Sequence, residues 1–138
     1  MAISFQTQQI QFKLSDKVKI RSWIKTIIES EKKKPGELNF VFTSDEEVLK
    51  TNIQFLKHNT YTDIITFDYC EGKTINGDII ISIERVEENA GKFKVDFETE
   101  LKRVIIHGVL HLCGYKDKSE KDSSLMRSKE NSALKKFI

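Results

Sequence analysis

The sequence predicts an α+β fold in which a small mixed sheet of about four strands packs with about five helices. Segments with strand and helix periodicity alternate in the first half of the chain, and three helical segments follow one another at its end. One of those three is mostly apolar, so we expect it to be the buried helix. A chain of 138 residues with 38% apolar and 32% charged residues can enclose one core. We therefore expect a single domain over residues 1–138.

Strand and helix signals begin near the N-terminus. A first strand is expected over residues 3–5 and a second over residues 37–43. Between them, Ser15 can cap a first helix, and Pro35 with Gly36 indicates a turn before the second strand. The apolar side chains that recur with helical period in this first helix are Val18, Ile20, Trp23, Ile24, Ile27 and Ile28.

A second helix and two further strands follow. Ser44 and Glu47 have the spacing of a capping box, which starts a helix. Residues 58–62 are expected to form a loop, residues 63–69 a third strand and residues 76–82 a fourth. The fourth strand contains a run of isoleucines, which predicts a central position covered on both faces.

Three helices are expected in the last third of the chain. Ser82 can cap the first of them, which extends towards Ala90, and residues 91–94 predict a break. The apolar helix begins at about Asp96. Ser119 can cap the last helix.

The apolar helix carries two of the three histidines of the chain, His107 and His111. At this spacing they lie one turn apart on one face, so both imidazoles can bind the same metal ion. Gly114 predicts the end of the helix, and Asp117 follows closely enough to supply a third ligand. Three protein ligands and a bound water are typical of a catalytic zinc site. The sequence therefore predicts one Zn²⁺ per chain on His107, His111 and Asp117, with the metal-bound water as the catalytic group.

The histidine pair also has a plain structural interpretation. Histidines on an apolar helix are often hydrogen-bonded core residues, and a pair at this spacing can face solvent by chance. Glu100 and Arg103 lie on the same ridge of the helix as the histidines, however. A polar stripe along a buried helix requires a function, which favours the metal site.

The stretch HGVLHLCGYKD resembles HGxLHLxGYDH, the signature of the YbeY family of bacterial metal-dependent endoribonucleases. The matching positions are His107, Gly108, Leu110, His111, Leu112, Gly114 and Tyr115. The family's aspartate is Lys116 here, and its third histidine is Asp117. Aspartate is a competent zinc ligand, so we interpret the change as a ligand swap. The anionic ligand lowers the net charge of the site, so a bound water should be less acidic and its hydroxide a stronger nucleophile.

The resemblance covers roughly residues 45–135 and includes several other motifs. The matching positions are Asn52, Phe55, Thr62 to Phe67, Gly77 to Ile79, Met126, Glu130 and Leu134. One departure is Leu56, which stands where the family has an arginine whose implied role is to grip the RNA phosphate. Lys57 and His58 follow directly and can contribute charge instead, although both are equally interpretable as ordinary exposed loop residues.

The chemistry of the motif separates two classes of hydrolase. Helical zinc proteases have a glutamate directly after the first histidine, and Gly108 in that position disfavours proteolysis. The resemblance implies instead a single-strand-specific, metal-dependent endoribonuclease that matures rRNA, notably the 3′ end of the small-subunit rRNA, and acts in ribosome quality control. Lys57, His58, Lys116 and Lys118 are the expected substrate-binding residues. Two alternatives stay open: a non-catalytic, ribosome-associated RNA-binding factor, and a zinc hydrolase of another ester or amide.

Composition and the absence of targeting signals indicate the cellular location and the expected partners. No apolar run has the length of a membrane span and no signal peptide is evident, so we expect no membrane association. Cys70 and Cys113 make no disulfide framework, which indicates the cytoplasm, and Cys113 is expected to pack rather than bind metal. A net charge of +2 does not by itself indicate RNA binding. The expected partners are single-stranded rRNA and the ribosome or its small subunit, and a His-His-Asp set also suits iron, nickel or manganese.

Overall fold

The structure is a computed structural model that describes residues 2–57 and 62–137. Its sheet contains β1 (Ala2–Thr7), β2 (Lys34–Thr43), β3 (Ile64–Asp68) and β4 (Thr74–Ser82). The strand order is β1-β2-β4-β3, with β1, β2 and β4 parallel and β3 antiparallel to β4. Within the described residues the sheet is therefore mixed and four-stranded, as the sequence predicts.

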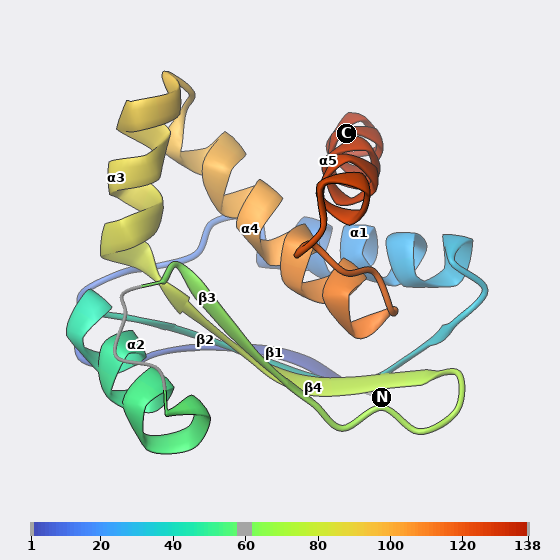
Figure 1. The fold of residues 1–138 in the computed structure, drawn as a ribbon, viewed down its shortest axis with the longest axis horizontal. Coiled ribbons are helices and arrows are strands. Elements are labelled where there is room, and N and C mark those ends of the chain that lie inside the picture. Colours follow the sequence, from blue (N-terminus) through green and yellow to red (C-terminus); the bar gives the residue numbers. More distant parts are fainter. Residues whose placement is uncertain (1, 58–61, 138) are drawn as a thin grey trace.

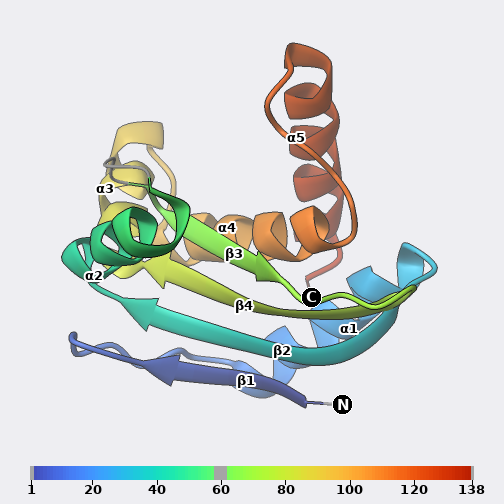
Figure 2. The ribbon, with the colours of Figure 1, turned by 60° about the horizontal axis from the view of Figure 1, so that its bottom comes forward.

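Five α-helices and one π-helix are found in the described part of the chain. They are α1 (Lys17–Ser30), α2 (Asp45–Thr51), the π-helix η1 (Asn52–Leu56), α3 (Ile83–Phe93), α4 (Phe97–Leu112) and α5 (Glu120–Lys135). Helices α1, α3, α4 and α5 lie on one side of the sheet, and α2 lies on the other side at one end (Figures 1 and 2). The α+β prediction is confirmed.

The main core lies between the sheet and α4, which is the buried helix that the sequence predicts. Alternate residues of β4, including Ile79 and Ile81, are fully buried against this side. Gly108 allows α4 to approach the sheet closely, because a Cβ at this position would lie 2.9 Å from Cδ1 of Ile64 and 3.1 Å from Cγ2 of Ile79. This contact holds the histidine-bearing turns of α4 beside β3.

Among the described residues, the second face of the sheet is covered where α2 and η1 pack on it, and Phe55 of η1 contacts Phe67 of β3 with ring centroids 5.7 Å apart. Val48 of α2 is buried there together with Val41 and Ile65. Ile80 and Asp78 of β4 point to the same face and are half-buried. The prediction that β4 is central is correct, but the prediction of cover on both faces is wrong for most of its length, because α2 is too short to span the sheet.

Side-chain caps fix the start of three helices, as predicted. Ser44, Ser82 and Ser119 accept hydrogen bonds from the backbone N–H groups three residues later, at 3.2, 3.0 and 3.0 Å. The first helix differs, because its N-cap is Asp16 rather than Ser15. Asp16 has a left-handed backbone (φ 59°) and no side-chain cap, and Val18 of the predicted apolar set is 79% exposed.

One predicted turn is continuous strand, and one predicted break between helices begins later than expected. Pro35 and Gly36 lie within β2 instead of forming a turn, with a register shift between Pro35 and Leu38 where β2 pairs with β4. Helix α3 continues through Gly91 to Phe93, and its C-cap Lys94, whose backbone is left-handed, starts the break that the sequence predicts from residue 91. The extension of β2 depends on pairing with β4, which local turn signals do not report.

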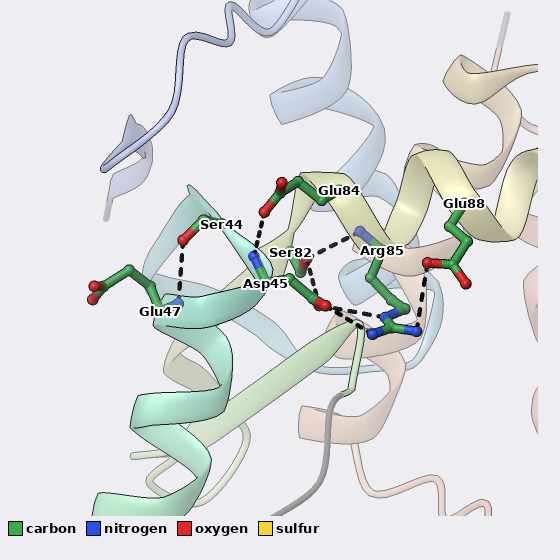
Figure 3. A network of polar contacts seen from close by, with 7 residues as sticks. All are labelled: Ser44, Asp45, Glu47, Ser82, Glu84, Arg85 and Glu88. Atoms are coloured by element: carbon green, nitrogen blue, oxygen red, sulfur yellow. Dashed lines mark hydrogen bonds and ion pairs between the residues drawn. The ribbon is translucent and has the colours of Figure 1, made fainter.

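A polar network joins the start of α2 to the start of α3 (Figure 3). Arg85 donates to both carboxylate oxygens of Asp45, at 3.3 and 2.7 Å, and Ser82 Oγ donates to Asp45 at 3.1 Å. Glu84 accepts from the Asp45 backbone N–H at 2.8 Å. A bidentate arginine–carboxylate pair restricts orientation strongly, so this network fixes α2, and the π-helix that continues it, relative to the β4–α3 connection.

Candidate functional site

The site is built on one ridge of α4. His107 and His111 lie on consecutive turns, with ring centroids 6.1 Å apart and ring planes 22° apart. The helix ends where the sequence predicts, since Gly114 has φ +113° and the Tyr115 N–H donates to the Leu110 carbonyl at 3.1 Å. The reversal of the chain after Gly114 brings Asp117 back to the helix.

Both ring nitrogens of His107 have carboxylate partners. Nδ1 lies 2.6 Å from Oε2 of Glu130 on α5, and Nε2 lies 3.1 Å from Oδ2 of Asp117. Arg103 donates to the other oxygen of Glu130 at 2.9 Å. Burial alone lowers the pKa of His107, but the hydrogen bond and charge of Glu130, together with the charges of Asp117 and Asp63, outweigh it and raise the pKa. Burial raises the pKa of Glu130, but the hydrogen bonds from His107 and Arg103 lower it overall.

The ring of His111 is oriented through the same nitrogen, Nδ1, by a different group. Its Nδ1 lies 2.8 Å from the backbone carbonyl oxygen of Tyr115. A carbonyl can only accept a hydrogen bond, so in the neutral ring of His111 the proton is on Nδ1 and the lone pair is on Nε2. Partners on Nδ1 of this kind are typical of metal-binding histidines, because they orient the ring and leave Nε2 for the ion.

The predicted ligands border one pocket of about 400 Å³. It is lined by Asn52, Leu56, Thr62, Asp63, Ile64, Ile65, Thr66, His107, His111 and Asp117. Leu56 is thus part of the wall in the position where the resemblance places an arginine. Lys57, Lys116 and Lys118 are exposed and are not among the lining residues. His58 lies outside the described residues.

The types of donor atom suit a zinc ion, although the three side chains do not converge on one point in the structure. Donors on a tetrahedral zinc ion with bonds of about 2.0 Å lie roughly 3.3 Å apart, and the 3.1 Å between Nε2 of His107 and Oδ2 of Asp117 is close to this. Within residues 2–57 and 62–137, however, no three His, Cys, Asp or Glu side chains are arranged together to hold an ion. The chemistry of the donors fits zinc, and the three-ligand site stays a prediction.

Two acidic residues of the site come from outside the histidine motif. Asp63, at the start of β3, lines the pocket, and its pKa is raised by burial, an effect that His107 partly offsets. Glu130 is buried on α5. The sequence signal for Glu130 is its spacing, because it recurs with Met126 and Ala133 on the buried face of the last helix. We assigned neither residue a role from the sequence.

The two cysteines are free thiols outside this pocket. Burial raises the pKa of Cys113 to about 12. The Sγ of Cys70 donates to the Leu112 carbonyl at 3.6 Å and to the Asn76 carbonyl at 3.4 Å. Cys113 is half-buried and packs against the core, as expected from the sequence.

The fold and the pocket together define a small α+β protein with two oriented imidazoles and a carboxylate around one cavity. The family described as Endoribonuclease YbeY matches residues 2–138. The chain belongs to this family.

Individual relatives agree with this. The protein named Endoribonuclease YbeY from Flavobacterium psychrophilum is 55% identical over 135 residues, which cover 98% of this chain and 96% of the relative. The protein of the same name from Bacteroides fragilis is 46% identical over 134 residues, covering 97% and 96%. The solution structure of TM1509 from Thermotoga maritima is 28% identical, with a TM-score of 0.68 over 97% of this chain and 87% of that one. No helix in the described ranges is long and apolar enough to cross a membrane.

Proposed function

We propose that this chain is a single-strand-specific, metal-dependent endoribonuclease that acts in rRNA processing, including 3′-end maturation of the small-subunit rRNA, and in ribosome quality control. Membership of the endoribonuclease YbeY family over residues 2–138 supports a hydrolase that cleaves RNA. Its partners would be single-stranded rRNA and the ribosome or its small subunit, which implies a cytoplasmic location.

We infer one Zn²⁺ per chain, held by His107, His111 and Asp117. The observation that carries this inference is the pair of Nδ1 contacts, to Glu130 and to the Tyr115 carbonyl, which orient the rings so that Nε2 of His107 lies 3.1 Å from Asp117, the third proposed ligand, and Nε2 of His111 is left for an ion. A bound zinc ion would lower the pKa of water and neutralise charge on the phosphoryl oxygens.

The protein's own groups would orient the site and hold the RNA. Glu130 fixes the ring of His107 and is itself fixed by Arg103. Lys116 and Lys118 flank Asp117 and are exposed, and Lys57 follows Leu56 of the pocket wall. Lysines in these positions would bind phosphates with salt-dependent, sequence-tolerant affinity. His58 is proposed for the same role from its place in the sequence.

A second candidate is a ribosome-associated RNA-binding factor without catalytic activity. Two observations favour it: Leu56 replaces the arginine of the family pattern, and no three-ligand group is gathered among the described residues. An RNA-binding factor would keep the lysines and need no metal. A zinc hydrolase of another ester or amide would keep the metal and not need the lysines.

Cleavage of a single-stranded RNA that contains the 3′ end of the small-subunit rRNA separates these candidates. Purified protein should cut it, a chelator should stop cleavage, and added zinc should restore it. His111→Ala should reduce cleavage to background while RNA binding is largely kept. Glu98→Ala, which changes an exposed residue of the same helix, is the control and should cut normally.

Each outcome assigns the protein to one candidate. Cleavage by His111→Ala at the wild-type rate would mean that the activity uses another site or comes from a contaminant. RNA binding without cleavage under any metal condition would favour the binding factor. Elemental analysis of protein purified without added metal would identify the ion.

A further inference from the structure

A second pocket of about 320 Å³ adjoins the first. Its lining includes Asp63, Ile64, His107 and Asp117, which also line the first pocket. The two pockets therefore meet at His107 and Asp117. The remaining walls of the second pocket come from α3, α4 and α5. Since the proposed metal ligands stand between the pockets, an RNA strand cut at the first pocket would place a neighbouring nucleotide in the second.

A glutamate that is buried in the fold and opens into the cavity distinguishes this second pocket. Glu100 of α4 lines it and is only 5% exposed. Among the described residues no hydrogen bond or ion pair to its carboxylate is found, because Arg103, one turn away, donates to Glu130 at 2.9 Å and to Asn131 at 2.8 Å. Burial raises the pKa of Glu100. No side-chain nitrogen or oxygen that is shielded from solvent lacks a hydrogen-bond partner in the described residues, so the oxygens of Glu100 are open to the pocket that this residue lines, where a ligand can reach them.

The rim of the pocket offers an aromatic surface. Phe93, near the end of α3, lines the pocket and is 54% exposed. Arg127 of α5 is also exposed at the rim. Proteins that bind unpaired RNA bases stack them on aromatic side chains and read their edges with polar groups. A carboxylate inside and an aromatic ring at the rim therefore suit a nucleobase.

We propose that this second pocket binds the nucleobase next to the cleaved phosphodiester and that Glu100 selects guanine. This inference rests on the proposed endoribonuclease function. Guanine presents N1–H and N2–H side by side, so the two oxygens of one carboxylate can accept both. Adenine and cytosine present one amino group beside an acceptor nitrogen, and uracil presents one N–H between two carbonyl groups.

Cleavage of matched RNA oligonucleotides tests the proposal. The oligonucleotides share one constant single-stranded sequence and differ at a single position, which is guanosine, inosine, adenosine or uridine. Further sets place this variable position at other points along the strand. At one position beside the cleavage site, the wild-type protein should prefer guanosine to inosine, which lacks the N2 amino group, by about 10-fold in kcat/KM. Glu100→Gln should lose this preference while still cutting the uridine strand. Glu98→Gln, on the exposed side of α4, should keep it.

A binding assay on chelator-treated protein provides a readout that does not depend on catalysis. The same oligonucleotides, labelled with a fluorophore, should bind the wild-type protein more tightly with guanosine than with inosine. Phe93→Ala should weaken binding of every base at this position, and because Phe93 is exposed this variant should fold even if Glu100→Gln does not. Tyr69→Ala removes an aromatic side chain that is 57% exposed and lies outside this pocket, so it should bind as the wild type does.

The outcomes separate the pocket from the nuclease. Equal cleavage and equal binding of all four strands would overturn the guanine pocket and leave the endoribonuclease proposal intact. Failure to cut any strand, combined with tighter binding of guanosine that Phe93→Ala reduces, would overturn the nuclease and support the pocket. Loss of stability in Glu100→Gln with unchanged base preference would overturn the role of Glu100.

Discussion

Nδ1 of His107 on α4 and Oε2 of Glu130 on α5 lie 2.6 Å apart, although 23 positions separate the two residues in the chain. Glu130 is 4% exposed, and its other oxygen accepts a hydrogen bond from Arg103. The last helix is therefore attached to the histidine helix at the proposed site itself. Packing of α5 and orientation of His107 depend on the same carboxylate.

Replacement of Glu130 by glutamine should weaken metal binding. The amide keeps the size of the side chain but removes the charge that holds both His107 and Arg103. Removing a hydrogen-bond partner of a metal-binding histidine typically lowers metal affinity or activity by about 10–100-fold. We expect a loss of this size in the zinc affinity of Glu130→Gln. Zinc titration against a competing chelator measures it. Glu120→Gln, at an exposed position of α5, is the control, and equal zinc affinities in both variants would contradict the orienting role.

Glu100 should reduce the stability of the protein at neutral pH. Burial raises its pKa above the ordinary value of 4.5, so the folded state holds the proton more tightly than the unfolded state does. The loss of stability is absent below pH 4.5, because the Glu100 carboxyl is protonated in both states. It grows as the pH rises to the pKa of Glu100 in the folded protein and is constant above that pKa. Glu100→Gln should therefore raise the midpoint of thermal unfolding at pH 7.5 by a few degrees, roughly 3–5 °C for each 1 kcal/mol.

The pH dependence distinguishes this effect from a general change in packing. The difference in unfolding midpoint between Glu100→Gln and the wild type should shrink as the pH falls towards 4.5. Glu98→Gln should show no such difference at either pH. A variant less stable than the wild type at pH 7.5 would mean that the Glu100 carboxylate has a stabilising partner.

The parts of the fold that were predicted correctly depend on local sequence. The caps at Ser44, Ser82 and Ser119 each involve a backbone N–H three residues away, so a short sequence pattern is sufficient. The start of β2 depends on distant residues. The Lys34 N–H donates to the Lys73 carbonyl at 2.8 Å, and this pairing extends the strand through Pro35 where local signals indicate a turn.

The residues of the candidate site likewise fall into those that local sequence indicates and those that only the packing of distant elements brings to the site. His107, His111 and Asp117 belong to one helix end and the turn after it, and all three line one pocket, whereas their binding of a single ion stays a prediction. Asp63 and Glu130 reach the site from β3 and α5, and only the packing of those elements on α4 brings them there. The lysines contribute exposed charge, and no buried contact identifies their roles.

Replacing each of two helical glycines by alanine should change the free energy of unfolding in opposite directions. A Cβ on Gly108 would lie 2.9 Å from Ile64 and 3.1 Å from Ile79, whereas a Cβ on Gly91 has nothing within 4 Å. Gly91→Ala should raise the free energy of unfolding by about 0.5–1 kcal/mol, because alanine is the better helix former. Gly108→Ala should lower it by about 1–3 kcal/mol through overpacking and should also reduce cleavage, because α4 must move away from β3. Denaturant unfolding of both variants checks this, and a stabilised Gly108→Ala protein would contradict the close packing.

Replacement of Asp117 by histidine should shift the pH dependence of cleavage. If Asp117 is a metal ligand, its negative charge lowers the net charge of the site, and the neutral histidine of Asp117→His raises it by one unit. Water bound at a more positive site ionises at lower pH. The acidic limb of the kcat/KM profile should therefore lie at lower pH in Asp117→His than in the wild type. Asp122→His places the same change near the start of α5 and should leave the limb unmoved. Profiles that coincide for wild type and Asp117→His would mean that the Asp117 carboxylate does not bind the ion.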